Sequence, residues 1–114
     1  MRLQVRGIQV TIGGELRSAI GRRMRFVLGR AANHIVSVTV LLDGSLNSAG
    51  DDTKLCRITV RLTNSGVVSV ADTGADVHAT VNRVSERVGR SVHRELQRRR
   101  DQRRNPPLIV RATR

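Results

Sequence analysis

The residues best suited to chemistry are arginines that recur at three- and four-residue spacing late in the chain. They are Arg83, Arg87, Arg90, Arg94 and Arg98. At about 100° per residue, this spacing places them in one arc of a helix. A guanidinium is a planar fork of N–H donors that can grip phosphate through two hydrogen bonds and can stack on bases. The pattern therefore predicts a surface that binds the backbone of a nucleic acid.

The overall charge supports the same prediction. The chain has 114 residues and a formal net charge of +12, and Lys54 is the only lysine among its 21 Lys and Arg residues. Such an excess gains affinity for a polyanion by releasing condensed counterions. Acidic membranes or acidic proteins are other targets of basic surfaces, but the bias toward arginine favours phosphate. The first ten residues contain Arg2 and Arg6 and no long apolar run, so neither a secretory signal nor a membrane span is predicted.

Other chemistries find little support in the sequence. His34, His78 and His93 are scattered, with no two at the spacing of helical metal ligands, so no metal site is predicted. Cys56 is the only cysteine and lies on the apolar face of the predicted strand 56–62, which indicates a buried thiol. A single, unpaired cysteine also fits a reducing cytoplasm. No set of nucleophile, base and orienting group is evident. We expect a protein that is not an enzyme and needs neither a cofactor nor a small-molecule substrate.

Period-two alternation predicts four strands that could support the arginine surface. They cover residues 3–8, 35–42 and 56–62, followed by a strand that contains Val68 and Val70. A loop rich in Gly, Ser and Asn joins the second and third strands, and a turn signal at residues 64–66 joins the third and fourth. These three strands are therefore expected to form an antiparallel meander.

Two helical stripes complete the pattern. The first runs from Gly13-Gly14 to Gly29 or Asn33, and the second starts at about Ala75 with Asp72 or Thr73 as its cap. Their apolar residues are Leu16, Ile20, Met24, Val27 and Leu28, then Val77, Val81, Val84, Val88 and Val92. Beyond Leu96 the stripe stops and residues 98–100 are all arginine, so this end is expected to project into solvent or onto a polyanion.

The order strand, helix, three strands, helix predicts an α+β fold of two layers. The apolar faces pack best if a four-stranded sheet carries two helices on one face, which leaves the outer helix surfaces free. Residues 1–104 are expected to form this single domain. Residues 105–114 include Pro106-Pro107, which forbids helix continuation, and are expected to be a mobile C-terminal tail.

Several segments, taken in this order, carry a resemblance to a known family. They are Leu3-Gln4-Val5-Arg6-Gly7, Glu15-Leu16-Arg17, the strand 35–41, Val70-Ala71-Asp72 leading into 76–81, and the basic helix segment 86–94. In order and spacing the chain resembles ribosome hibernation-promoting factors, also called ribosome-associated translation inhibitors. Their fold is similar to a double-stranded-RNA-binding domain. The sequence departs from the family at His78, where an aromatic residue is usual, and at Gly13, where a Thr cap is typical.

The resemblance implies a cytoplasmic protein that binds ribosomal RNA of the small ribosomal subunit, in the channel for mRNA and tRNA, and blocks initiation. The family's basic positions correspond to Arg23, Arg87, Arg90 and Arg94. Helix geometry alone adds further RNA-binding candidates. These are Arg22, Arg25, Arg83 and Arg98.

Two other functions compete with this one. The chain could be a general module for structured RNA that reads shape and backbone without preferring ribosomes. It could also be a basic adaptor for an acidic protein, in which case nuclease would not affect binding. Phe26 is the only aromatic residue, which argues against base stacking on single strands and predicts contacts mostly to phosphate.

Overall fold

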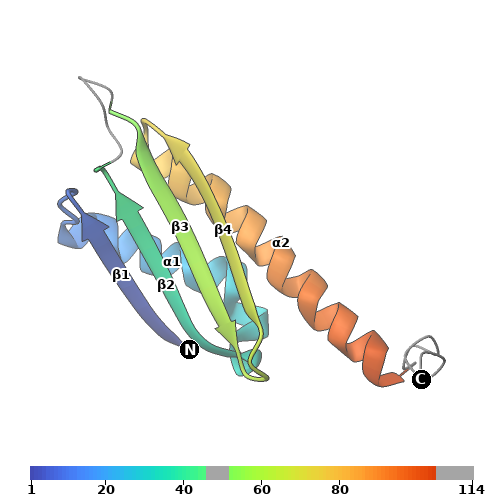
Figure 1. Cartoon of the computed structure of the whole chain (residues 1–114). Helices are drawn as coiled ribbons and strands as arrows, with labels where there is room; N and C mark the ends of the chain where they lie inside the picture. Colours follow the sequence, from blue (N-terminus) through green and yellow to red (C-terminus); the bar gives the residue numbers. More distant parts are fainter. Residues whose placement is uncertain (46–51, 105–114) are drawn as a thin grey trace.

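A four-stranded sheet with the strand order β1-β2-β3-β4 carries both helices on one face (Figure 1). The computed structural model describes residues 1–45 and 52–104. Its elements are β1 (Arg2–Ile8), α1 (Gly14–Leu28), a 3₁₀ turn η1 (Gly29–His34), β2 (Ile35–Asp43), β3 (Lys54–Leu62), β4 (Val67–Gly74) and α2 (Val77–Arg104). The predicted α+β sandwich is thus confirmed. The tail 105–114, expected to be mobile, lies outside the described residues.

The strand register shows a mixed sheet. β1 pairs with β2 in parallel, Leu3 lying opposite Val38, as the crossover through α1 requires. β2, β3 and β4 form the predicted antiparallel meander, in which Ile58 lies between Val40 and Val70.

The core fills the space between the sheet and the helices. Its fully buried side chains come from both predicted stripes and from the inward positions of β2 and β3. They include Ile20, Met24, Leu28, Val38, Val40, Leu42, Cys56, Ile58, Val60, Val84, Val88 and Val92. The alternation along the strands and the three-to-four spacing along the helices therefore identified the inward faces correctly.

The start of α2 differs from the prediction. Asp72 and Thr73 do not cap the helix, because both are still paired with β3, opposite Cys56 and Leu55. Asp76 is the cap instead: its Oδ1 accepts a hydrogen bond from the Ala79 backbone N–H at 3.2 Å. The correction matters for function because it leaves the Asp72 carboxylate available to other partners.

The two helices approach each other closely at one point. A Cβ added to the buried Gly89 of α2 would lie 3.3 Å from the backbone oxygen of Val27 in α1. A side chain there would need the helices to separate, so glycine sets their spacing.

The C-terminal part of α2 runs past the end of the sheet (Figure 1). Leu96 is the last apolar residue of the helix that packs against the core. Arg98 and Arg100 are exposed, as expected for this end. Arg99 differs from this expectation, because only 19% of its side chain is exposed. It lies against Gly66 in the β3–β4 turn and pairs with Glu95. Within the described ranges, no helix is long and apolar enough to cross a membrane.

Candidate nucleic-acid interface

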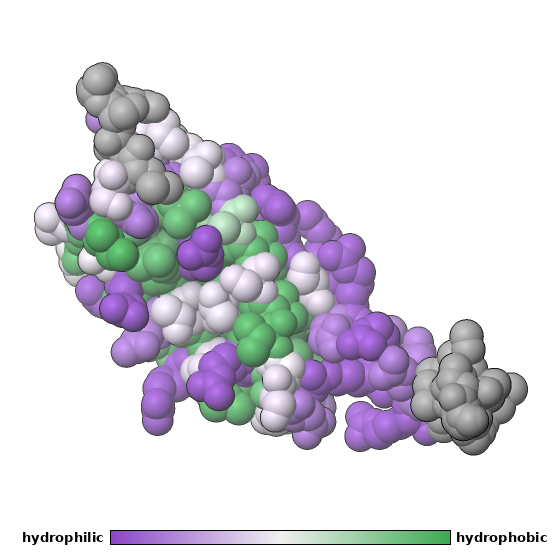
Figure 2. Space-filling view, viewed as in Figure 1, coloured by the Kyte–Doolittle hydropathy of each residue, from purple (hydrophilic) through white to green (hydrophobic). Residues whose placement is uncertain are grey.

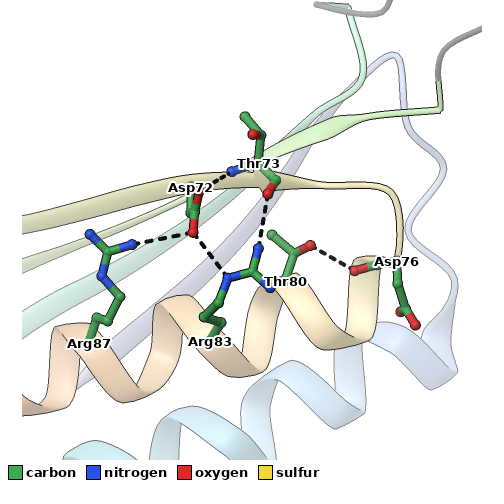
Figure 3. Close-up of polar contacts among 6 residues, drawn as sticks. All are labelled: Asp72, Thr73, Asp76, Thr80, Arg83 and Arg87. Atoms are coloured by element: carbon green, nitrogen blue, oxygen red, sulfur yellow. Dashed lines mark hydrogen bonds and ion pairs between the residues drawn. The ribbon is translucent and has the colours of Figure 1, made fainter.

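Two of the predicted arginines at the start of α2 are tied to the sheet (Figure 3). Arg83 Nε and Arg87 Nη1 lie 3.0 and 3.4 Å from Asp72 Oδ2 on β4. Arg83 also donates to the backbone oxygen of Thr73 at 2.9 Å. Arg83 and Arg87, here called the anchored pair, thus link α2 to β4 while their side chains remain about half exposed, at 47% and 46%.

The Asp72 carboxylate is held in its charged form. The Thr73 backbone N–H donates to Asp72 Oδ1 at 2.8 Å, and this bond, followed by the bond from Arg83, lowers the pKa of Asp72 below its ordinary value. One negative charge therefore sits between the two positive charges of the anchored pair. Their net attraction for an external phosphate is reduced accordingly.

The next two arginines of α2 have no such partner. Neither Arg90 nor Arg94 forms an ion pair with any described residue, and both are exposed. Arg94 donates only to the hydroxyl of Ser91, at 3.2 Å. Arg90 and Arg94, here called the open pair, thus carry positive charge that no carboxylate compensates.

Arg98 shares an acid with its neighbour. Its Nη2 lies 2.6 Å from Glu95 Oε2, and Arg99 Nε lies 3.2 Å from the same oxygen. The Arg98 hydrogen bond is the main cause that lowers the pKa of Glu95. Arg98 is 58% exposed, so it remains accessible, but Glu95 already compensates part of its charge.

The three candidates on α1 separate in space. Arg23 turns toward α2, where its Nη2 lies 3.3 Å from Glu86 Oε2. Its Nε is buried and has no hydrogen-bond partner among the described residues. Arg25 instead lies over Gly21, at the side of α1 that faces Leu3 of β1. Arg22 is exposed and forms no hydrogen bond or ion pair within the described part of the chain. The structure therefore brings Arg23, but not Arg25, next to the arginines of α2.

A second set of arginines, which the site prediction did not include, lies on the opposite face of the sheet. Arg2 and Arg6 of β1 and Arg57 and Arg61 of β3 alternate with core residues and are exposed. Through β2 they form two rows, because Arg2 and Arg61 both pair with Ser37, and Arg6 and Arg57 both pair with Leu41. Figure 2 looks onto this face, where hydrophilic side chains project around a paler and partly apolar centre. The alternation showed a basic face on β3, but only the strand order joins it to β1.

The remaining titratable groups form no separate site. No group of three His, Cys, Asp or Glu residues within 1–45 and 52–104 could hold a metal ion. His34 and His78 are exposed, and burial raises the pKa of Cys56 to about 11, so its thiol is neutral at ordinary pH.

Comparison with known proteins adds the family. The sequence profile of the family described as sigma 54 modulation protein / S30EA ribosomal protein matches residues 3–100. No curated protein matches the chain in sequence. Among solved structures, the N-terminal domain of protein Y from Thermus thermophilus is similar, with a TM-score of 0.68 and 23% identity over 82% of this chain and 98% of that one. A ribosomal subunit interface protein from Coxiella burnetii gives a TM-score of 0.69 and 15% identity over 85% and 99% of the two chains. These likenesses establish the shared fold, and the profile match shows that the chain belongs to the sigma 54 modulation / S30EA ribosomal protein family, the family of ribosome hibernation factors.

Proposed function

We propose that this protein binds ribosomal RNA of the small ribosomal subunit, in the channel used by mRNA and tRNA, and thereby blocks initiation. Membership of the S30EA family supports a ribosomal role, and one structural neighbour is itself named a ribosomal subunit interface protein. The observation that carries the proposal is the open pair, two exposed arginines without a carboxylate partner in the described chain.

The proposed mechanism is occupation of space. A protein that covers the channel excludes mRNA and tRNA by its volume, so it acts in stoichiometric amounts, without turnover and without a cofactor. This agrees with its family, which is not known as a family of enzymes. Such a protein works where ribosomes translate, so we place it in the cytoplasm.

The electrostatics of α2 support a phosphate-rich partner. Beyond the anchored pair, acids neutralise only part of the positive charge of the helix, and neighbouring like charges at helical spacing repel one another. Contact with a phosphate backbone relieves this repulsion and releases counterions. Binding to small subunits is therefore expected to weaken steeply as salt is raised.

The test is charge reversal on the two faces of the sandwich. The triple variant Arg87→Glu, Arg90→Glu and Arg94→Glu alters the helix face, and the control Arg6→Glu, Arg57→Glu and Arg61→Glu makes the same change of charge on the sheet face. Both should remain folded in thermal melts, because exposed substitutions usually shift stability by at most about 0.5 kcal/mol each. We expect the helix variant to lose binding to small subunits and inhibition of cell-free translation. Inhibition equal to that of the parent would refute the proposal.

Sedimentation of the protein with small subunits, with and without nuclease, tests the competing functions. A general module for structured RNA would bind other duplex RNA equally well. An adaptor for an acidic protein would keep its partner after nuclease treatment. Neither result is expected.

A further inference from the structure

A groove runs between α1 and α2 beside the open pair. Its volume is about 570 Å³, within the usual range for sites that take small molecules or single residues of a polymer. It is lined by Val27 of α1 and by Glu86, Gly89, Arg90, His93 and Arg94 of α2. The floor is apolar, since Gly89 has no side chain there and Val27 fills the α1 side. The four other lining residues carry polar heads, three of them arginine or histidine and one the carboxylate of Glu86.

Phe26, the one aromatic residue of the chain, adjoins the groove residue Val27 in α1. Its exposed fraction is 81%, the highest among the large apolar residues that the structure describes. Arg23 connects it to the groove: the Arg23 Cζ lies 5.8 Å from the centroid of the Phe26 ring, and the same guanidinium pairs with Glu86 on the rim. The cation is close enough to hold the ring by a cation–π contact. One ring face is thus available to a flat ligand.

His93 adds a directed polar group. Its Nδ1 lies 2.8 Å from the backbone oxygen of Gly89. A carbonyl oxygen only accepts, so Nδ1 carries the proton, and Nε2 of the neutral ring is left with a lone pair. Nε2 can therefore accept a hydrogen bond from a base N–H.

We propose that this groove receives one unstacked nucleotide of the bound RNA. The base stacks on Phe26 at the edge of the apolar floor, the open pair holds the adjoining phosphates, and His93 Nε2 contacts the edge of the base. An aromatic face, a directed nitrogen and two guanidiniums are the groups that single-stranded RNA sites combine. The inference rests on the proposed function but adds base recognition, where the sequence predicted contacts mainly to phosphate.

Because the chain has no Trp and no Tyr, Phe26→Trp places a single fluorophore at the site. We expect its emission to be quenched when an oligoadenylate is added at low salt, because stacking brings the base onto the indole. An abasic oligomer of the same length should quench it far less. The control is Val67→Trp, on the opposite sheet face at a position 60% exposed, whose emission should respond equally little to both oligomers.

The second arm uses intact small subunits. Phe26→Leu keeps the apolar bulk at an exposed position and should fold like the parent, yet its affinity should fall roughly tenfold, the usual order for losing one stacked base. Phe26→Trp should bind like the parent. If Phe26→Leu binds subunits as the parent does, or if abasic RNA quenches as well as oligoadenylate, the nucleotide site is refuted. In that event, loss of binding in the triple glutamate variant would still leave the proposed function standing.

Discussion

Two neighbouring stretches of α2 carry the same residue type and differ in what surrounds it. The anchored pair, Arg83 and Arg87, shares the Asp72 carboxylate of β4. The open pair, Arg90 and Arg94, has no acid partner in the described chain. Equal charge in a sequence therefore does not mean equal availability to a ligand.

The difference between the two pairs arises from the residues that β4 presents to α2. α2 returns in the direction opposite to β4, so successive turns of the helix meet strand residues in descending order. The inward positions of the strand are Asp72, then Val70 and Val68, and Gly66 lies in the turn beyond. Only the first of these is an acid, so among the described arginines of α2 only Arg83 and Arg87 find a carboxylate partner on β4.

The largest expected effect comes from reversing the charge of the open pair. Arg90→Glu with Arg94→Glu should lower affinity for small subunits about 100-fold, because a hydrogen bond to a charged group contributes roughly 1.5 to 3 kcal/mol. The negative slope of log affinity against log salt should also become shallower by about one for each lost phosphate contact.

Arg83→Glu with Arg87→Glu is the matched control for that experiment. It should reduce affinity less and the melting temperature more, because Asp72 would then face two further carboxylates. Equal loss of affinity in both double variants would remove the distinction between the anchored and the open pair.

Val88→Ala tests the inner face that lies beneath both pairs. Val88 is fully buried, so its truncation should lower the free energy of unfolding by roughly 1 to 3 kcal/mol. Binding per folded molecule should be unchanged, as measured by titration of small subunits well below the melting temperature. A loss of affinity without a loss of stability would show that the two faces of α2 are not independent.

Asp72→Asn addresses the anchored pair alone. The side chain is exposed enough for solvent to screen it, so we expect a small fall in melting temperature and no loss of subunit binding. The pKa of Asp72 is lowered in the folded protein, so its stabilising effect is present above the unfolded pKa, near 4, and is lost as pH falls through the folded value. The melting difference between parent and variant should therefore disappear in acid and persist at neutral pH.

The smallest signal is the reactivity of Cys56. This thiol is buried, its pKa is raised to about 11, and its residue pairs directly with Asp72 across the two strands. Iodoacetamide at pH 8 should label the native protein only through local opening of β3 from β4. Asp72→Asn should speed labelling, whereas rapid labelling of the native parent would contradict the buried position.

Local patterns predicted the frame of the molecule well. The inward side of β3 follows from the alternation that includes Ile58 and Val60, and the inward side of α2 follows from its valine stripe. Both patterns can be read from residues that are close in sequence. The pairing of acids with arginines is not determined locally. Asp72 lies 11 and 15 residues from Arg83 and Arg87, and the contact depends on β4 extending through Asp72 to Gly74.

The groove between α1 and α2 could not be predicted from the sequence, for a similar reason. Phe26 and Arg94 belong to different helices, and the contact at Gly89 that brings those helices together depends on their packing. A lone aromatic residue therefore predicted no stacking site. The sheet-face arginines likewise required the parallel pairing of β1 with β2 before they formed one surface.

The contacts that fix α2 to the rest of the protein become fewer beyond Leu96. Toward its start the helix is fixed by buried valines and by Asp72, whereas past Leu96 it is held mainly by Glu95 with Arg98 and Arg99 and by the contact at Gly66. Segments with few buried contacts open at low free energy, so the backbone amides of the last turns should exchange with solvent fastest. In the proposed complex with ribosomal RNA, the first half of the helix would set the orientation of the protein, and its last turns would adjust to the shape of the RNA.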